Sequence, residues 1–456
     1  MRPRQLGGMQ GFFLLWSGQL ISALGTSLTS FAITIWAFQE TGQATTLALV
    51  GLFSFGPSIL VGPLAGALVD RWNRRLVTGI SDVAAVISTV VLLILHTSGT
   101  LEVWHLFVLG AWSGIFGAFQ WPATSAWIST LVPKEQYGRT SGMMSLIEAV
   151  PMIAAPFLAA LILSVAGLGT VLVIDIVTCV LAVASLAFVL VPKRAAANGR
   201  VPARRSFTNE LAFGFRYIAA RRGLLGLMMM FAAVNLVSGM YGIMSSATVL
   251  SRTGNDAVAL GSVQSLAGVG ALVGGVLMGV WGGPKVKVYG IFSCLIAAGL
   301  FGSTLFAAAR GVPMMMAGAF VYLFCMPILN GSSQAIWQRK VAPEVQGKVF
   351  AARRMLAQVF HPVSLLVAGP LADKVMEPAF SSPDASWLAG AFGSIVGTGP
   401  GAGMAFILLV SGFLLAGAAF VGILNPNVRN VETELADHDP NIRPLTSPPE
   451  AAFATQ

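Results

Sequence analysis

Three carboxylic acids stand inside long apolar stretches of this sequence: Asp82, Glu148 and Asp175. Placing an ionisable group at the centre of a membrane helix costs about 2.5 to 3.5 kcal/mol on insertion scales, so such a group is a functional candidate by default. A carboxyl group that alternates between water and an apolar interior changes its affinity for a proton. These positions therefore offer proton uptake and release, or the attraction of a cation.

The three acids differ in their surroundings along the chain. Glu148 lies about two turns before Pro156, and both a proton-carrying and a structural carboxyl group suit that position. Asp82 lies about two turns from the arginines within residues 71–75, which favours a structural ion pair over proton transfer. Asp175 stands towards the outer end of its stretch, where we expect it to reach water.

Other polar side chains in the apolar stretches form a second group of candidates. His361 is a candidate because an ordinary imidazole titrates near neutral pH, although a structural role is the simpler interpretation of this position. An uncharged amide or hydroxyl in a membrane helix bonds a neighbouring helix more often than it contacts a ligand. The candidates for lining a substrate cavity are Gln19, Thr26, Asn235, Gln264, Asn330 and Gln334.

The elements that must hold these side chains are long and apolar. Of the 456 residues 55% are hydrophobic, and the mean hydropathy is +0.78. A membrane-spanning helix needs about 20 apolar residues, whereas barrel strands show about ten residues of alternation. Twelve stretches are long enough: 12–38, 45–69, 76–96, 103–131, 143–166, 169–191, 224–249, 257–281, 287–308, 312–337, 349–376 and 403–425. The sequence predicts an all-α membrane protein with twelve transmembrane helices.

The positive charges predict the orientation of these helices. With twelve spans, 24 of the 27 Lys and Arg residues fall on the side of the two termini, and three fall on the other side. Basic connections stay in the cytoplasm. We therefore expect a multi-pass protein of the cell membrane, inner or plasma, with both termini cytoplasmic. The net charge of +9 then reflects topology and does not indicate binding to nucleic acid.

The chain divides into two halves of six stretches. Residues 1–191 and 223–425 are predicted to form the two bundles, and residues 426–456 a disordered cytoplasmic tail. The linker, residues 192–222, contains an amphipathic segment that suits a helix lying at the membrane interface, with a simple loop as the alternative. VPKEQYGR at 132–139 is matched by VAPEVQGK at 341–348. Duplicated bundles of this kind can rock around a central cavity.

Several segments resemble one family of transporters. They are residues 15–49, GPLAGALVDRWNRR at 62–75, LVPKEQYGRTSGMMS at 131–145, GTGPGAGM at 397–404 and NVRNVETELADHDP at 427–440. With the layout of the spans, they make the chain similar to the major facilitator superfamily, and within it to the drug:H+ antiporter branch that includes macrolide exporters and the enterobactin exporter. The resemblance implies two pseudo-symmetric six-helix bundles, alternating access and proton antiport.

The resemblance also assigns a gate. The family's G-x-x-x-D-R-x-x-R-R connection falls here on Gly66, Asp70, Arg71, Arg74 and Arg75. An acid at that helix end would pair with a cation or cap a partner helix in one conformation, and so bias the equilibrium between two states. The alternative is that these arginines only set the topology. The corresponding segment of the second half has Gly282 in place of the acid, which predicts an asymmetric gate.

Further family features are present only in part. AAPFLAA, around Pro156, resembles an exporter motif with alanines in place of glycines, and its proline predicts a bent fifth helix. The family builds its pathway largely from spans one, four, seven and ten. Where many proton-coupled exporters have an arginine in span four this chain has Gly110, and Thr26 stands where an acid often follows the first-span glycine. Proton antiport is thus implied by resemblance alone.

Taken together, these features predict a secondary active exporter of amphipathic small organic molecules, such as a drug, a siderophore or a secondary metabolite. Its expected partners are that substrate, protons and membrane lipids, and we expect a monomer. The sequence shows no phosphate-binding loop ending in GK[ST], no metal-binding cluster and no hydrolase motif, so we predict no cofactor, no nucleotide and no catalysis. The alternatives are a lipid or nutrient carrier of the same fold, and a membrane receptor or scaffold that transports nothing.

Overall fold

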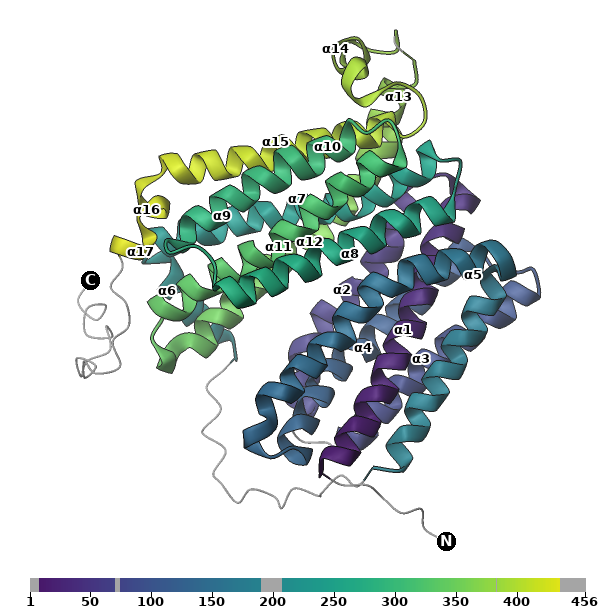
Figure 1. Cartoon of the computed structure of the whole chain (residues 1–456), viewed down its shortest axis with the longest axis vertical. Helices are drawn as coiled ribbons and strands as arrows, with labels where there is room; N and C mark the ends of the chain where they lie inside the picture. The colour runs from purple at the N-terminus through teal and green to yellow at the C-terminus, as the bar shows by residue number, and fades with distance from the viewer. Residues whose placement is uncertain (1–7, 70–73, 190–206, 383, 435–456) are drawn as a thin grey trace.

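The computed structural model describes residues 8–69, 74–189, 207–382 and 384–434 (Figure 1). These residues are almost entirely helical, and no β-strand element occurs among them. Eleven of the described helices are long and apolar enough to cross a membrane. The predicted all-α membrane fold is confirmed. Asp70 and Arg71 of the predicted gate lie outside the described residues.

The first half of the chain folds into five long helices. They are α1 (Gly8–Thr41), α2 (Ala44–Val69), α3 (Arg74–Thr97), α4 (Val103–Leu131) and α5 (Tyr137–Ala187), with the short η1 (Lys134–Gln136) before α5. The fifth helix has 51 residues and contains both the fifth and the sixth predicted stretch. Gly167 breaks it with a φ of 76°, a backbone conformation that glycine adopts without strain. The twelve predicted stretches and the eleven spanning helices therefore agree.

The second half begins with a shorter helix and continues with the remaining spans. Its elements are α6 (Phe207–Ala219), α7 (Arg222–Arg252), α8 (Ala257–Trp281), α9 (Lys287–Ile296), η2 (Ala297–Ser303), α10 (Thr304–Ala307), α11 (Val312–Lys340), α12 (Pro343–Leu371), η3 (Ala372–Met376), α13 (Glu377–Ala379), α14 (Trp387–Val396), α15 (Ala402–Leu424), α16 (Pro426–Arg429) and α17 (Val431–Glu434). Both η2 and η3 are wider π-turns that continue the helices before them. Such turns occur frequently at functional sites.

Two acids cap helix N-termini within the second half. Oδ1 of Asp256, the residue before α8, accepts hydrogen bonds from the backbone N–H groups of Val258 at 2.8 Å and Ala259 at 3.1 Å. Glu377 accepts from the N–H groups of Gly401 and Met404 at the start of α15, at 3.1 and 2.9 Å. A carboxylate at this position satisfies N–H groups that have no partner within the helix.

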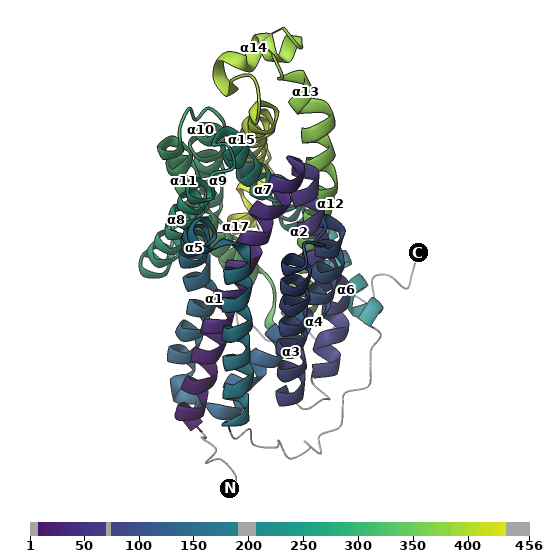
Figure 2. The ribbon, with the colours of Figure 1, turned by 90° about the vertical axis from the view of Figure 1, so that its right-hand side faces the viewer.

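The helices gather into two bundles, one made of α1 to α5 and the other of α7 to α15 (Figures 1 and 2). We call the end that carries Gly8 and the start of α6 the near end, and the end that carries the turn between α1 and α2 the far end. In Figure 1 the bundles approach one another where α5 meets α8 and diverge towards the near end. The exact limits of the two domains and of the linker stay predictions.

Small residues bring the bundles together in the far halves of their helices. A methyl group built at Gly261 of α8 would lie 2.6 Å from the carbonyl oxygen of Pro156, and one at Gly268 would lie 2.9 Å from that of Met152. Between the same two helices, the N–H of Phe157 donates to the hydroxyl of Ser265 at 3.2 Å. Close backbone approach through glycine is the usual way in which helices associate inside membranes.

Candidate functional site

A polar cavity of about 330 Å³ lies inside the first bundle. Helices α1 to α5 all contribute to its wall, which combines apolar residues with hydroxyl, amide and carboxyl groups. Two of the three predicted acids, Asp82 and Asp175, line this one cavity and are only 2% and 1% exposed. A buried charge is costly unless its environment supplies hydrogen bonds, so the partners of the two carboxyl groups determine what each can do.

Asp82, on α3, is held by two amide side chains. Its Oδ2 accepts a hydrogen bond from Gln19 Nε2 at 3.2 Å, and its Oδ1 accepts one from Gln120 Nε2 at 2.9 Å. Gln120 Nε2 also lies 3.3 Å from the amide oxygen of Gln19, which closes the network. Amide NH2 groups only donate, so this shell suits an ionised carboxylate. The predicted ion pair with the arginines stays untested, because Arg71 and the side chains of Arg74 and Arg75 lie outside what the structure describes.

Asp175, on the second part of α5, is surrounded by hydroxyl and thiol groups. Thr26 donates to its Oδ1 at 3.1 Å, and Thr89 donates to its Oδ2 at 2.8 Å. The thiol of Cys179 lies 3.4 Å from Oδ1. The prediction that Asp175 reaches water at the end of its span is wrong, because its side chain points into the bundle and is buried. A hydroxyl group both donates and accepts, so this shell also satisfies a protonated carboxyl group.

Glu148 lies outside this cavity and is exposed. It precedes Met152 by one helical turn on α5, and the Met152 carbonyl oxygen faces Gly268 of the other bundle. Glu148 therefore continues the face of α5 that meets α8, but it does so towards the near end, where the bundles diverge (Figure 1). The solvent exposure of the Glu148 side chain therefore depends on how far apart the two bundles lie at this point.

His361 lies at the contact between the bundles. Its ring is half-buried and meets the ring of Phe55 edge-to-face, with 5.1 Å between the centroids. Phe55 belongs to α2 and His361 to α12. Pro156 lies in the other inter-bundle contact, where its carbonyl oxygen faces Gly261.

The other cavity candidates lie in the second bundle, away from Gln19 and Thr26. Asn235 donates to the carbonyl oxygen of Phe231 in its own helix at 2.7 Å, and Gln264 donates to the hydroxyl of Ser246 at 3.1 Å. The Gln334 side-chain oxygen accepts from Arg353 at 2.9 Å, at a second cavity of about 550 Å³. Asn330 is exposed. The structure thus divides the six candidates between two bundles.

For the predicted gate, the structure describes only the two helices that flank the connection. Gly66 lies in the last turns of α2, and Arg74 and Arg75 begin α3. The three described residues of the motif therefore stand at the near end, in the helices on either side of the α2–α3 connection.

Sequence reasoning missed Gln120 and Thr89, which complete the shells of the two buried acids. Gln120 could have been predicted from the sequence, because it is an amide in the fourth span, and the family resemblance assigns that span to the pathway. Thr89 could not have been predicted, because a threonine in an apolar helix commonly bonds to the backbone of its own helix. The Thr89 hydroxyl also does this, donating to the Ala85 carbonyl oxygen at 3.3 Å.

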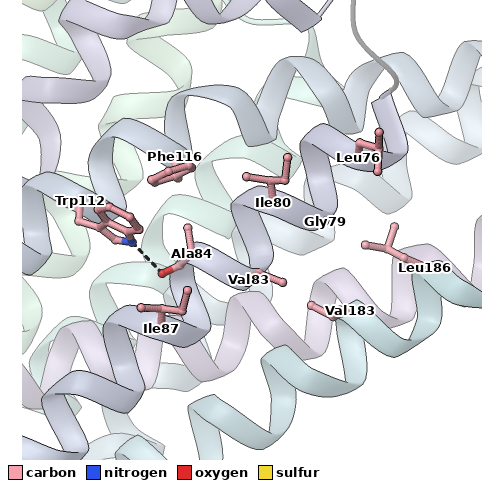
Figure 3. A pocket seen from close by; sticks show the side chains of 10 residues that line it. All are labelled: Leu76, Gly79, Ile80, Val83, Ala84, Ile87, Trp112, Phe116, Val183 and Leu186. Atoms are coloured by element: carbon pink, nitrogen blue, oxygen red, sulfur yellow. Dashed lines mark hydrogen bonds between the residues drawn. The ribbon is translucent and has the colours of Figure 1, made fainter.

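An apolar groove of about 450 Å³ runs along the outside of the same bundle (Figure 3). Side chains of α3, α4 and α5 line it, and Trp112 donates to the Ala84 carbonyl oxygen across it at 3.0 Å. Phe116 also lines the polar cavity and therefore borders both the groove and the cavity.

Comparison with known proteins decides the family. The model of the protein family described as "Major Facilitator Superfamily" matches residues 15–365, well over half of the 456 residues. The chain belongs to the major facilitator superfamily. A member of this superfamily is a membrane transporter and not an enzyme.

Individual members of the superfamily are similar over most of the chain. Macrolide efflux protein A of Streptococcus pyogenes is 26% identical over 372 residues, covering 80% of this chain and 90% of that protein. The multidrug efflux pump Tap of Mycolicibacterium fortuitum is 27% identical over 381 residues, covering 78% and 90%. Among solved structures, a bacterial homologue of the human lysosomal transporter Spinster, described as inward-facing and unoccupied, has a TM-score of 0.65 at 18% identity and covers 94% of this chain and 99% of that one.

Proposed function

We propose that this transporter exports amphipathic organic molecules by alternating access, driven by proton antiport. The observation that carries the proposal is the asymmetry of the inter-bundle contact: the far halves of α5 and α8 are in close contact, whereas the two bundles diverge towards the near end (Figure 1). Two bundles that meet at one end and part at the other suit one state of a rocking transporter.

The direction of opening follows from the charges. The topology predicted from the sequence puts 24 of the 27 Lys and Arg residues on the side of the two termini. Gly8, at the start of α1, lies at the near end, so the near end would face the cytoplasm. The structure would then be the inward-facing state, which receives a cytoplasmic substrate. Export by the related macrolide and multidrug efflux proteins supports the same direction.

The substrate class follows from the composition of the spans and from the relatives. Only 10% of the residues are charged, while 18 Met, 28 Phe and 10 Trp supply adaptable apolar surface. Flexible surfaces of this kind bind varied partners. An exposed acid at Glu148, on the face that looks towards the other bundle, would favour amphipathic molecules that carry a positive charge.

For the coupling ion, Asp175 has the most suitable surroundings. Its hydroxyl partners satisfy both the ionised and the protonated carboxyl group, so the proton can be exchanged without leaving a buried polar atom unpaired. Asp82 would hold α1, α3 and α4 in place through its two amide partners. Glu148 would contact the substrate.

A reconstituted system tests this function. Purified protein in proteoliposomes that contain a pH-sensitive dye should release protons into the lumen when a macrolide or a cationic dye is transported in the opposite direction. Asp175→Asn should abolish the proton signal while substrate exchange without a gradient continues. Substrate flux that is indifferent to the pH gradient in the wild type would rule out proton antiport, and absence of any flux would rule out export of these substrates.

A further inference from the structure

The first N–H groups of α2 are bound by an acid from the other bundle. Asp373 lies in η3, at the far end of the span that α12 begins. Its Oδ1 accepts from the N–H of Ala44 at 3.0 Å, and its Oδ2 accepts from the N–H of Thr45 at 2.7 Å. The start of a helix carries unpaired N–H groups and a partial positive charge, so a carboxylate with both oxygens engaged forms a complete cap.

Such a cap normally comes from the residue just before the helix, as Asp256 does for α8. The residue before α2 is Gln43, which is not one of the favoured capping residues, and Gly42 before it turns the chain with a φ of 65°. The N-terminus of α2 therefore obtains its acidic cap from the second bundle.

The same place is packed too closely to tolerate a larger residue. Gly369, one turn before Asp373, lies against α2, and a methyl group built there would lie 2.6 Å from the Cα atom of Thr45 and 3.1 Å from the Cβ atom of Ala48. The cap and the close approach form one contact between the bundles at the far end. Neither can persist if the far ends separate.

We propose that Asp373 is a latch that stabilises the conformation closed at the far end. The proposal rests on the alternating-access part of the proposed function. Opening of the far end would expose the Ala44 and Thr45 N–H groups and the carboxylate to water, so the cap stabilises only the state seen here.

Distance measurements on the purified full-length protein test the latch. Spin labels at Thr170 and Pro313, exposed far-end positions in the first and second bundle, would report the separation by pulsed electron resonance. Asp373→Ala should raise the ratio of far-open to far-closed molecules about fivefold, the usual effect of losing an acidic cap. Asp373→Asn keeps an acceptor oxygen without the charge and should shift the ratio less. Gly369→Ala should shift it in the same direction as Asp373→Ala.

Asp256→Ala is the matched control. It removes an acidic cap of the same chemistry from α8, but this cap lies within one bundle, so the distance distribution should match that of the wild type. An unchanged distribution in folded Asp373→Ala and Gly369→Ala proteins would overturn the latch, as would an equal shift in Asp256→Ala. No substrate or proton gradient is needed, so this result is independent of whether the protein proves to be a proton-coupled exporter.

Discussion

At the scale of single residues, the two buried acids share a cavity but differ in what surrounds them. Asp175 is bound by hydroxyl groups that can reverse their roles, whereas Asp82 is bound by amide NH2 groups that cannot. We therefore expect Asp175→Asn to remove proton coupling. Asp82→Asn should instead lower the thermal stability of the protein and leave the ratio of protons to substrate unchanged. Parallel flux and dye measurements on the two variants check this difference, and loss of coupling in Asp82→Asn alone would reverse the assignment.

Glu148 gives a second prediction at this scale. Because its carboxylate is exposed on the face of α5 that looks towards the other bundle, Glu148→Gln should raise the KM for cationic substrates about tenfold. A neutral substrate of similar size serves as the control, and its KM should not change. If proton-driven transport of the neutral substrate is lost as well, Glu148 carries the proton and the role given to Asp175 is wrong.

At the scale of helices, the contact between α5 and α8 depends on glycine. Gly261→Ala would place a methyl group 2.6 Å from the Pro156 carbonyl oxygen, which no rotamer change relieves. The far halves should separate, and transport should fall severalfold while the protein still inserts into the membrane. Gly279→Ala is the control, because a methyl group at that position of the same helix meets no atom within 4 Å. Equal transport in both variants would contradict the importance of this contact.

The helices also show which parts of the structure the sequence predicts well. The stretches 103–131 and 257–281 match α4 and α8 to the residue, because charged, proline or glycine residues flank long apolar runs. The shells of Asp82 and Asp175 were not predictable in this way, since their partners Gln120 and Thr89 stand on other helices and nothing local fixes which side chains meet. The capping of α2 by Asp373 joins residues 329 positions apart and depends entirely on how the bundles meet.

At the scale of the whole molecule, alternating access predicts opposite accessibility at the two ends of the inter-bundle face. Ser145 is exposed on α5 near Glu148, whereas Ser265 of α8 is partly buried where it accepts the N–H of Phe157. The three native cysteines among the described residues are buried, so labelling of a single cysteine introduced at 145 or at 265 can be measured without interference from them. In the state seen here the first should react with a thiol reagent at least tenfold faster than the second.

Labelling from each side of the membrane separately tests the orientation of the protein. Since the near end is proposed to face the cytoplasm, an impermeant thiol reagent should label Ser145→Cys in inverted vesicles and spare it in right-side-out vesicles. Combined with Asp373→Ala, Ser265→Cys should become about fivefold more reactive, and only from the outside, because the latch no longer holds the far ends together. Labelling of both positions from the same side would show that the bundles separate without alternating. The charge asymmetry, the glycine contacts and the acidic cap would then describe a static arrangement rather than one half of a transport cycle.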